Sequence, residues 1–262
     1  MKEKTRWSEK ILKMHAGLVY AFLYIPIIVL VVFSFNSSKR NAVWKGFTLD
    51  WYYQLMHNTE LLRALENSLK VGIIATICST IIGALAALAL VRYDFKLKPA
   101  FESAIFVPLV IPEIVMGVAL LTCFVGLKIR LSLLTVILSH IAFCSSYVAV
   151  TVRARLHGFN RTLEEAAMDL GADEWTTFKK VSFPIIFPGI LAGGMLAFTL
   201  SFDDFVITFF NAGVGSTTLP LKVYSMLKFG ITPEINAIST LMLLITFTFV
   251  LIFNKLQSDE VH

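Results

Sequence analysis

The sequence predicts an all-α integral membrane protein with six transmembrane helices, and composition and apolar run length are the observations that predict it. Of the 262 residues, 56% are hydrophobic and only 16% are charged, whereas soluble globular chains carry roughly 25% charged residues. The mean hydropathy of +0.74 agrees with this. The apolar residues gather in stretches of about 20 residues, the length that a helix needs to cross the hydrocarbon. Runs of that length exclude the strands of a barrel.

Six stretches qualify as spans, between about residues 14 and 253, and they leave no room for a large soluble domain. We therefore expect one domain, residues 1–262. The basic N-terminus followed by an apolar run resembles a signal peptide. That run is too long for one and lacks a small-residue cleavage site, so we expect an uncleaved first span. The spans are approximately Met14–Phe35, Ser68–Val91, Phe101–Leu127, Leu131–Val152, Pro184–Phe210 and Asn236–Phe253.

The positive charges predict the orientation. Fourteen of the 23 Lys and Arg residues fall on the N-terminal side of the membrane if the six spans alternate. Because cytoplasmic segments are enriched in Lys and Arg, we expect both termini, residues 1–13 and 254–262, in the cytoplasm. The net charge of +5 is then explained by the orientation of the chain in the membrane, and it does not indicate nucleic-acid binding.

Two further features follow from composition. The outer loop from Asn36 to about Asn67 is rich in aromatic residues, which favour the membrane interface. Cys78, Cys123 and Cys144 all lie inside apolar stretches without CxxC or Cys/His spacing. We expect them to be packing residues, and we expect no metal site.

A polar segment separates the fourth and fifth spans. Its residues Leu163, Ala166, Ala167 and Leu170 recur at helical spacing, and Glu164 and Glu165 lie in the first turn, where the helix dipole favours carboxylates. Thr162 or Asn160 could cap this helix, and Gly171 allows the left-handed turn that ends it. Asp173 could cap a second short helix with an apolar edge of Trp175, Phe178 and Val181, which Pro184 stops or converts into the next span. From periodicity alone, an ordinary solvated loop is an equal alternative.

The same segment resembles the EAA signature of the membrane subunits of ABC importers, E-A-A, three residues, G, nine residues, I-x-L-P. Here the pattern is Glu165-Ala166-Ala167, three residues, Gly171, nine residues, then Val181-Ser182-Phe183-Pro184. Val and Phe replace Ile and Leu, which keeps both side chains apolar. The resemblance implies a type I ABC importer permease fold in which residues 158–183, hereafter the coupling segment, dock on a cytoplasmic ATPase. Glu165 would face the ATPase and Gly171 would supply the turn.

Other stretches resemble permeases of spermidine/putrescine importers. They are "YIPIIVLVVFSFNSS" in the first span, "SHIAFCSSYVAVTVRARLHGFN" around the fourth, and "LPLKVYSMLKFGITPEINA" before the sixth. Related permeases for other solutes share much of this pattern, so another small solute remains an alternative. The resemblance implies four partners besides lipid: a second permease, two copies of an ATPase subunit and an extracytoplasmic polyamine-binding protein.

Three acidic residues are candidates for a path that a polyamine cation would follow, because ammonium groups call for carboxylates and aromatic faces. Asp203 and Asp204 interrupt the fifth span about 30 Å along its helix, and a charge facing lipid costs roughly 3 kcal/mol. They line the path or mark the outer end of the span. Glu113 follows Pro108 and Pro112 inside the third span, where freed carbonyls are tolerated beside a cavity. It lines the path or pairs with a buried Arg or Lys.

Two residues are weaker candidates. Asn211 and the loop after it, "NAGVGSTT", could touch an external binding protein, although such loops are usually only turns. His140 in the fourth span is more simply a packing residue with satisfied hydrogen bonds than a ligand.

The sequence carries no motif for ATP hydrolysis or for a membrane hydrolase. No GxxxxGK[S/T], HExxH or GxSxG occurs, and none of the fourteen glycines precedes a lysine. We expect a non-catalytic subunit with no catalytic residue and no bound cofactor, since ATP and Mg²⁺ would belong to the partner ATPase. A self-sufficient secondary transporter or channel would leave the coupling segment unexplained, and a scaffold would leave the intramembrane acids unexplained.

Overall fold

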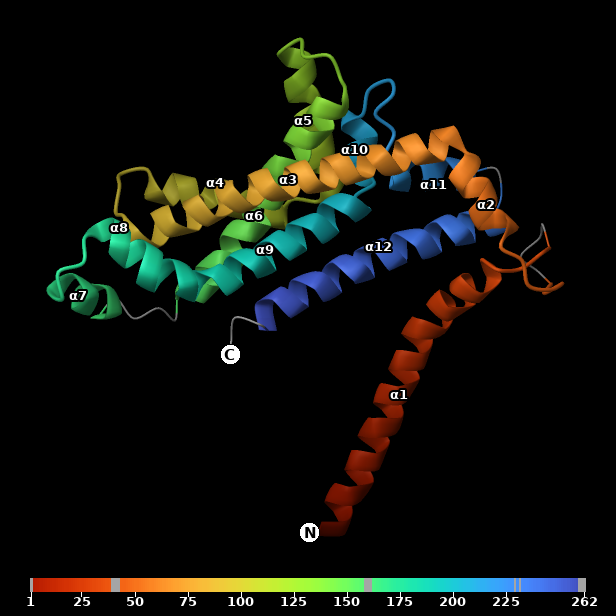
Figure 1. Ribbon diagram of the computed structural model, residues 1–262, viewed down its shortest axis with the longest axis horizontal. Coiled ribbons are helices and arrows are strands. Elements are labelled where there is room, and N and C mark those ends of the chain that lie inside the picture. The colour runs from red at the N-terminus through yellow and green to blue at the C-terminus, as the bar shows by residue number, and fades with distance from the viewer. Residues whose placement is uncertain (1, 39–42, 158–161, 229, 231, 259–262) are drawn as a thin grey trace. The chain divides into compact units, whose positions relative to one another are not determined.

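The computed structural model describes residues 2–38, 43–157, 162–228, 230 and 232–258 and consists of helices and loops (Figure 1). Apart from one isolated bridge between Asn36 and Phe47, no strand pairing occurs in these ranges. The all-α prediction is confirmed. Five helices are long and apolar enough to cross a membrane, and a bent pair of helices makes a sixth crossing if it counts as one span.

The chain forms two compact units. The first comprises Met1–Thr59 with Val223–Leu244, and the second comprises Glu60–Lys222 with Ile245–His262. The helices α11 (Leu219–Leu227) and α12 (Pro233–Ser258) are divided between the two units, and the first residue of the helix that begins at Thr59 also belongs to the first unit. Each unit is described separately.

The first unit contains α1 (Lys2–Phe33) and the short helix α2 (Asp50–His57). The aromatic loop between them is organised by Asn36. Its carboxamide oxygen accepts a hydrogen bond from the Lys45 amide at 3.0 Å, and its carbonyl accepts one from the Trp51 indole at 2.8 Å. The loop therefore folds back onto the end of α1.

The second unit is built around two long helices that lie side by side, α6 and α9 (Figure 1). Val148 of α6 is fully buried between glycines of two other helices. A Cβ at Gly83 would lie 2.6 Å from the Val148 Cβ, and one at Gly193 would lie 3.1 Å from its Cγ1. The close packing therefore requires glycine on both sides. The unit contains α3 (Thr59–Arg92), α4 (Lys98–Val110), α5 (Glu113–Gly126), α6 (Leu133–Leu156), α7 (Thr162–Asp169), α8 (Glu174–Thr177), the π-helix η1 (Phe178–Ser182), α9 (Phe183–Asp203) and α10 (Val206–Asn211).

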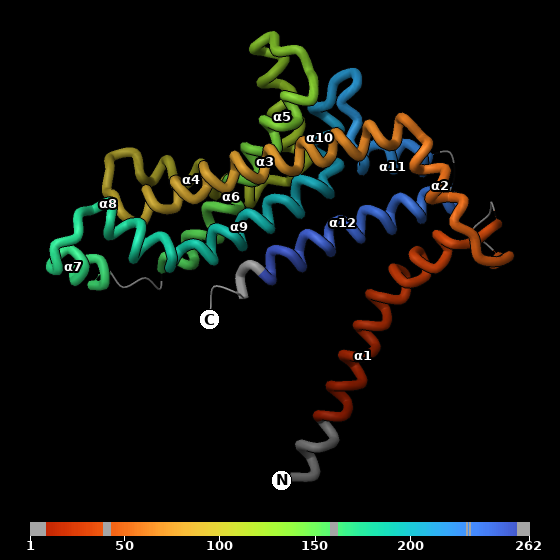
Figure 2. The backbone as a smooth tube through the Cα atoms, viewed as in Figure 1, coloured from red at the N-terminus to blue at the C-terminus, as the bar shows by residue number. Residues whose placement is uncertain are grey.

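The expected third span, Phe101–Leu127, is not one straight helix. It is divided into α4 and α5, which meet at 118° (Figure 2). A residue before proline is pushed out of the helical region, and Ile111, with ψ 134°, precedes Pro112, with ψ 138°. Expecting a continuous helix was wrong because Pro112 ends α4 instead of only weakening a longer helix.

The expected fifth span, Pro184–Phe210, also differs from the structure at both ends. The short helix after Gly171 does not stop at Pro184, because α8, η1 and α9 follow one another without a gap as a 30-residue span, Glu174–Asp203. At its other end the helix breaks at Asp204, which is extended with ψ 127°, and α10 begins two residues later.

Candidate functional site

The three acidic candidates differ in their surroundings. Asp204 is buried, with 9% of its surface exposed, whereas Asp203 and Glu113 are both exposed. Each of these two carboxylates interacts electrostatically with Asp204. At the break between α9 and α10, one buried acid therefore lies near two exposed ones.

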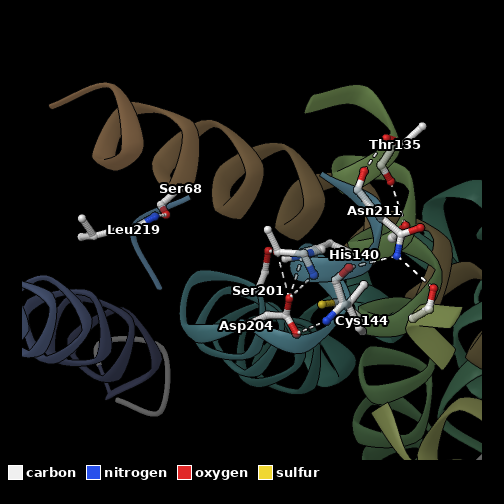
Figure 3. A network of polar contacts seen from close by, with 12 residues as sticks. Ser68, Thr135, His140, Cys144, Ser201, Asp204, Asn211 and Leu219 are labelled. Atoms are coloured by element: carbon white, nitrogen blue, oxygen red, sulfur yellow. Dashed lines mark hydrogen bonds and ion pairs between the residues drawn. The ribbon is translucent and has the colours of Figure 1, made fainter. Parts of the chain in front are cut away.

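Asp204 is held by the first turn of α10 (Figure 3). One carboxylate oxygen accepts a hydrogen bond from the Ile207 amide at 3.2 Å, and the other accepts from the Thr208 amide at 2.8 Å and the Thr208 hydroxyl at 2.9 Å. These contacts satisfy amides at the start of the helix, which have no partner within it. Asp204 therefore has a structural role at the start of α10, and its place on a substrate path stays a prediction.

His140 of α6 completes this network (Figure 3). It is 1% exposed, and its Nε2 lies 3.3 Å from the Asp204 carboxylate and 3.0 Å from the Thr208 hydroxyl. Its Nδ1 lies 2.7 Å from the Ser201 hydroxyl. Because a carboxylate only accepts hydrogen bonds, Nε2 is the donor toward Asp204, and the Ser201 hydroxyl can pair with Nδ1 as donor or as acceptor. The expectation of a satisfied packing histidine is confirmed, and in the described ranges no three His, Cys, Asp or Glu side chains gather as metal ligands would.

Asn211, at the end of α10, does not reach the surface. It is fully buried, and its amide donates to the Gly117 carbonyl of α5 at 3.2 Å. Its own carbonyl accepts from the Thr135 hydroxyl of α6 at 2.8 Å. The idea that Asn211 contacts an external protein is therefore wrong, because its polar groups fasten α10 to two neighbouring helices. In the loop after it, Val214 is 98% exposed, whereas Ser216 and Thr218 are buried.

The start of α3 fixes that exposed loop. The Asn67 amide donates at 3.0 Å to the carbonyls of both Gly215 and Thr217. The Ser68 hydroxyl accepts from the Leu219 amide at 2.7 Å (Figure 3). The loop is consequently attached to α3 by two hydrogen bonds, and the first residue of α11 is attached by a third.

The helix–turn–helix predicted for the coupling segment is present. Helix α7 is followed by Gly171 with a φ of +89°, the left-handed conformation that favours glycine. Asp173 caps α8 by accepting a hydrogen bond from the Thr176 amide at 3.0 Å. Asn160, the alternative cap of the first helix, lies outside the described residues.

The apolar residues of this segment are uncovered. Leu170 is 90% exposed, Trp175 68% and Leu163 50%. In the expected coupling set, Glu165, Ala166 and Gly171 are exposed and Ala167 is partly buried. Large apolar side chains that are exposed to solvent on a short helix–turn–helix form a surface suited to binding a partner protein.

Glu164, which precedes the EAA pattern, is less exposed than Glu165. It is paired with Arg92 at the end of α3, and it accepts a hydrogen bond from the Ser182 hydroxyl at the end of η1. Arg92 Nη2 also donates to Ser182 at 2.9 Å, and its guanidinium lies 5.7 Å from the centre of the Phe178 ring. The sequence analysis missed this cluster, because 72 residues separate Arg92 from Glu164 and no periodic pattern joins them.

A cleft of about 320 Å³ opens beside the Arg92 cluster. Its walls include Glu165 and Glu174 from the coupling segment and Tyr93 from the end of α3. The walls of the cleft therefore come both from the coupling segment and from the end of a membrane helix.

Comparison with known proteins identifies the family. Residues 79–258 match the family model described as "Binding-protein-dependent transport system inner membrane component". The chain is 44% identical over 242 residues to the spermidine/putrescine transport system permease protein PotC of Escherichia coli strain K12, covering 92% of both chains. It is 42% identical over 231 residues to the putrescine transport system permease protein PotI of the same strain, covering 86% of this chain and 82% of the relative.

Solved structures share the fold at low identity. A bacterial ABC transporter that imports the acidic polysaccharide alginate superposes with a TM-score of 0.78 at 17% identity, covering 98% of this chain and 96% of that one. The inward-facing MetNI methionine ABC transporter superposes with a TM-score of 0.64 at 16% identity, covering 79% and 98%. Together with the family match over more than half of its length, these likenesses show that the chain belongs to the binding-protein-dependent transport system inner membrane components and has the fold of an ABC transporter permease.

Proposed function

We propose that the chain is a permease subunit of an ABC importer that moves polyamines across the cytoplasmic membrane. The observation that carries the proposal is the 44% identity over 92% of the chain to a spermidine/putrescine permease. The matched region covers 242 residues, so the similarity is not confined to one motif.

The exposed acids fit the chemistry of such a substrate. A polyamine carries two or three ammonium groups on an alkyl chain, which carboxylates and aromatic faces can hold. Asp203 and Glu113 are exposed near the break, and Phe209, also half exposed, lies against Phe205 with ring centres 5.5 Å apart and the ring planes tilted by 40°. We assign Asp203 and Glu113 to the substrate path, with Asp204 holding the backbone that presents Asp203.

The coupling segment would connect this path to an ATPase. Glu165, Ala166 and Ala167 would contact a groove on the ATPase, and Gly171 would set the angle between α7 and α8. The chain itself would bind neither ATP nor Mg²⁺. It would work with a second permease, two ATPase copies and an extracytoplasmic polyamine-binding protein, with both termini in the cytoplasm.

The mechanism would be alternating access. ATP binding closes the ATPase dimer, and the coupling segments move the spans to an outward-open state. The binding protein then releases the polyamine into the path, and ATP hydrolysis returns the spans to the inward-open state. Carboxylates on the path would replace part of the water lost by the ammonium groups.

Uptake by the reconstituted complex tests the proposal. The complex is placed in proteoliposomes with its binding protein and ATP, and labelled putrescine, spermidine and an amino acid are compared. ATP-dependent uptake of a polyamine and not of the amino acid is expected. Uptake of a different solute instead would leave the family intact and overturn the polyamine assignment.

A further inference from the structure

Arg92 connects three parts of the second unit at one point. It extends from the end of α3 and contacts Glu164 of α7 and Ser182 of η1. Ser182 and Glu164 are also hydrogen-bonded to each other, so the three polar groups form a closed triangle. Each group of the triangle is therefore held by the other two.

The triangle is shielded from water more than an ordinary surface ion pair. The Arg92 side chain is 27% exposed and that of Glu164 is 16% exposed, and shielded pairs are screened less by salt. Phe178 covers one side of the guanidinium at 5.7 Å, a distance at which a cation is attracted to a ring face. The aromatic ring belongs to the π-helix, a local geometry that often occurs at functional sites.

We propose that Arg92 is a positioning residue for coupling, which makes α3 and the base of α9 follow the movement of α7. The two neighbouring carboxylates then have separate tasks. Glu165 is exposed and free to contact a partner, and Glu164 is paired with Arg92. The inference rests on the proposed function, because it requires an ATPase that moves the coupling segment.

The test compares transport with ATP hydrolysis in the complete complex in proteoliposomes. In Glu164→Gln and in Arg92→Glu, we expect the solute moved per ATP hydrolysed to fall about fivefold or more, the size of a typical coupling between two sites. The ATPase should still copurify at wild-type stoichiometry. The double variant Arg92→Glu/Glu164→Arg restores opposite charges, and we expect it to recover part of the ratio.

A similar ion pair supplies the matched control. Arg153 of α6 lies 2.6 Å from Glu102 of α4, with side chains 25% and 32% exposed, and neither residue belongs to the coupling segment. Glu102→Gln should leave the transport-to-hydrolysis ratio unchanged. A comparable fall of this ratio in Glu102→Gln would overturn the inference, because the loss of any partly buried ion pair would then be enough to reduce coupling.

Other outcomes also decide the question. Loss of the ATPase from the purified Glu164→Gln complex would mean that Arg92 only stabilises the docking surface, and the proposal would fail. An unchanged ratio in the single variants, or no recovery in the double variant, would overturn it too. These failures differ from failure of the proposed function, in which the wild-type complex itself takes up no polyamine.

Discussion

The imidazole of His140 and the carboxylate of Asp204 lie 3.3 Å apart, both almost completely buried, where α9 breaks and α10 begins. The pair joins α6 to this break, and Ser201 attaches the last turn of α9 to the same ring. The break is consequently fixed by side chains and not by a flexible link. Asp203, the residue directly before Asp204, is exposed at this break.

The two adjacent aspartates should therefore respond differently to the same substitution. In Asp204→Asn, an NH₂ group takes the place of one carboxylate oxygen. This donor then faces amide or hydroxyl groups that also donate, so no hydrogen bond forms there. Leaving such buried groups unsatisfied costs about 1–3 kcal/mol, so we expect a lower thermal unfolding midpoint in detergent. Asp203→Asn should leave that midpoint unchanged and reduce polyamine uptake severalfold.

Measuring both quantities in both variants gives each residue its own control. An unchanged midpoint in Asp204→Asn would contradict the structural role of the pair. Normal uptake in Asp203→Asn would contradict the acidic path while leaving the family assignment in place.

The spans and the coupling segment were predictable because each rests on a local pattern. Apolar runs of about 20 residues need no partner to be recognised, and the Gly171 turn and the Asp173 cap depend on neighbours within four residues. The structure confirms the Gly171 turn, the Asp173 cap and the apolar spans, although the third span is divided and the fifth has other ends. The polyamine substrate and the ATPase contact stay predictions.

The features that the sequence did not predict depend on distant residues. Two adjacent aspartates look alike in a sequence, and the contact of Asp204 with His140, 64 positions away, follows from no local pattern. The pairing of Glu164 with Arg92 likewise depends on how α3 and α7 meet. The sequence shows Pro112 but not how strongly it disturbs the helix, because a proline can either kink a span or divide it.

Gly83 tests the close packing of α3 on α6. A Cβ there would lie 2.6 Å from the Val148 Cβ and 2.7 Å from the Ser145 carbonyl oxygen. Because a backbone atom cannot move aside cheaply, Gly83→Ala should destabilise the protein by about 1–3 kcal/mol. Gly126, with nothing within 4 Å of its Cβ position, is the matched control. Equal unfolding midpoints for the two alanine variants would show that the helices do not pack in this way.

Gly171 tests the turn of the coupling segment. Its Cβ position is open, so only its φ of +89° restricts the side chain. A β-branched residue is strained in this region by about 1–2 kcal/mol, and we expect Gly171→Val to lower uptake while the ATPase still hydrolyses ATP. Asn tolerates the left-handed region better, so Gly171→Asn should retain more uptake. Full uptake in the valine variant would count against the coupling role.

The start of α8 should depend on pH through Asp173. Hydrogen bonds from the Thr176 hydroxyl and amide lower the pKa of Asp173 below its ordinary value, and the group lies outside the spans. A carboxyl whose pKa is lower in the folded state contributes stability above its unfolded pKa of about 3.9, and that contribution is lost as the pH falls through the folded pKa. Exchange of the amides of residues 174–177, corrected for its intrinsic pH dependence, should therefore become faster on acidification below about pH 4.

Asparagine at the same position separates the cap from its charge. Asp173→Asn keeps a side-chain oxygen that can accept from Thr176 but does not titrate, so its corrected exchange should show no such step. Asp173→Ala should exchange faster at every pH because the cap is missing. If the asparagine variant kept the acid step, another group would be responsible, and the hydrogen bonds of Asp173 would not hold the first turn of α8.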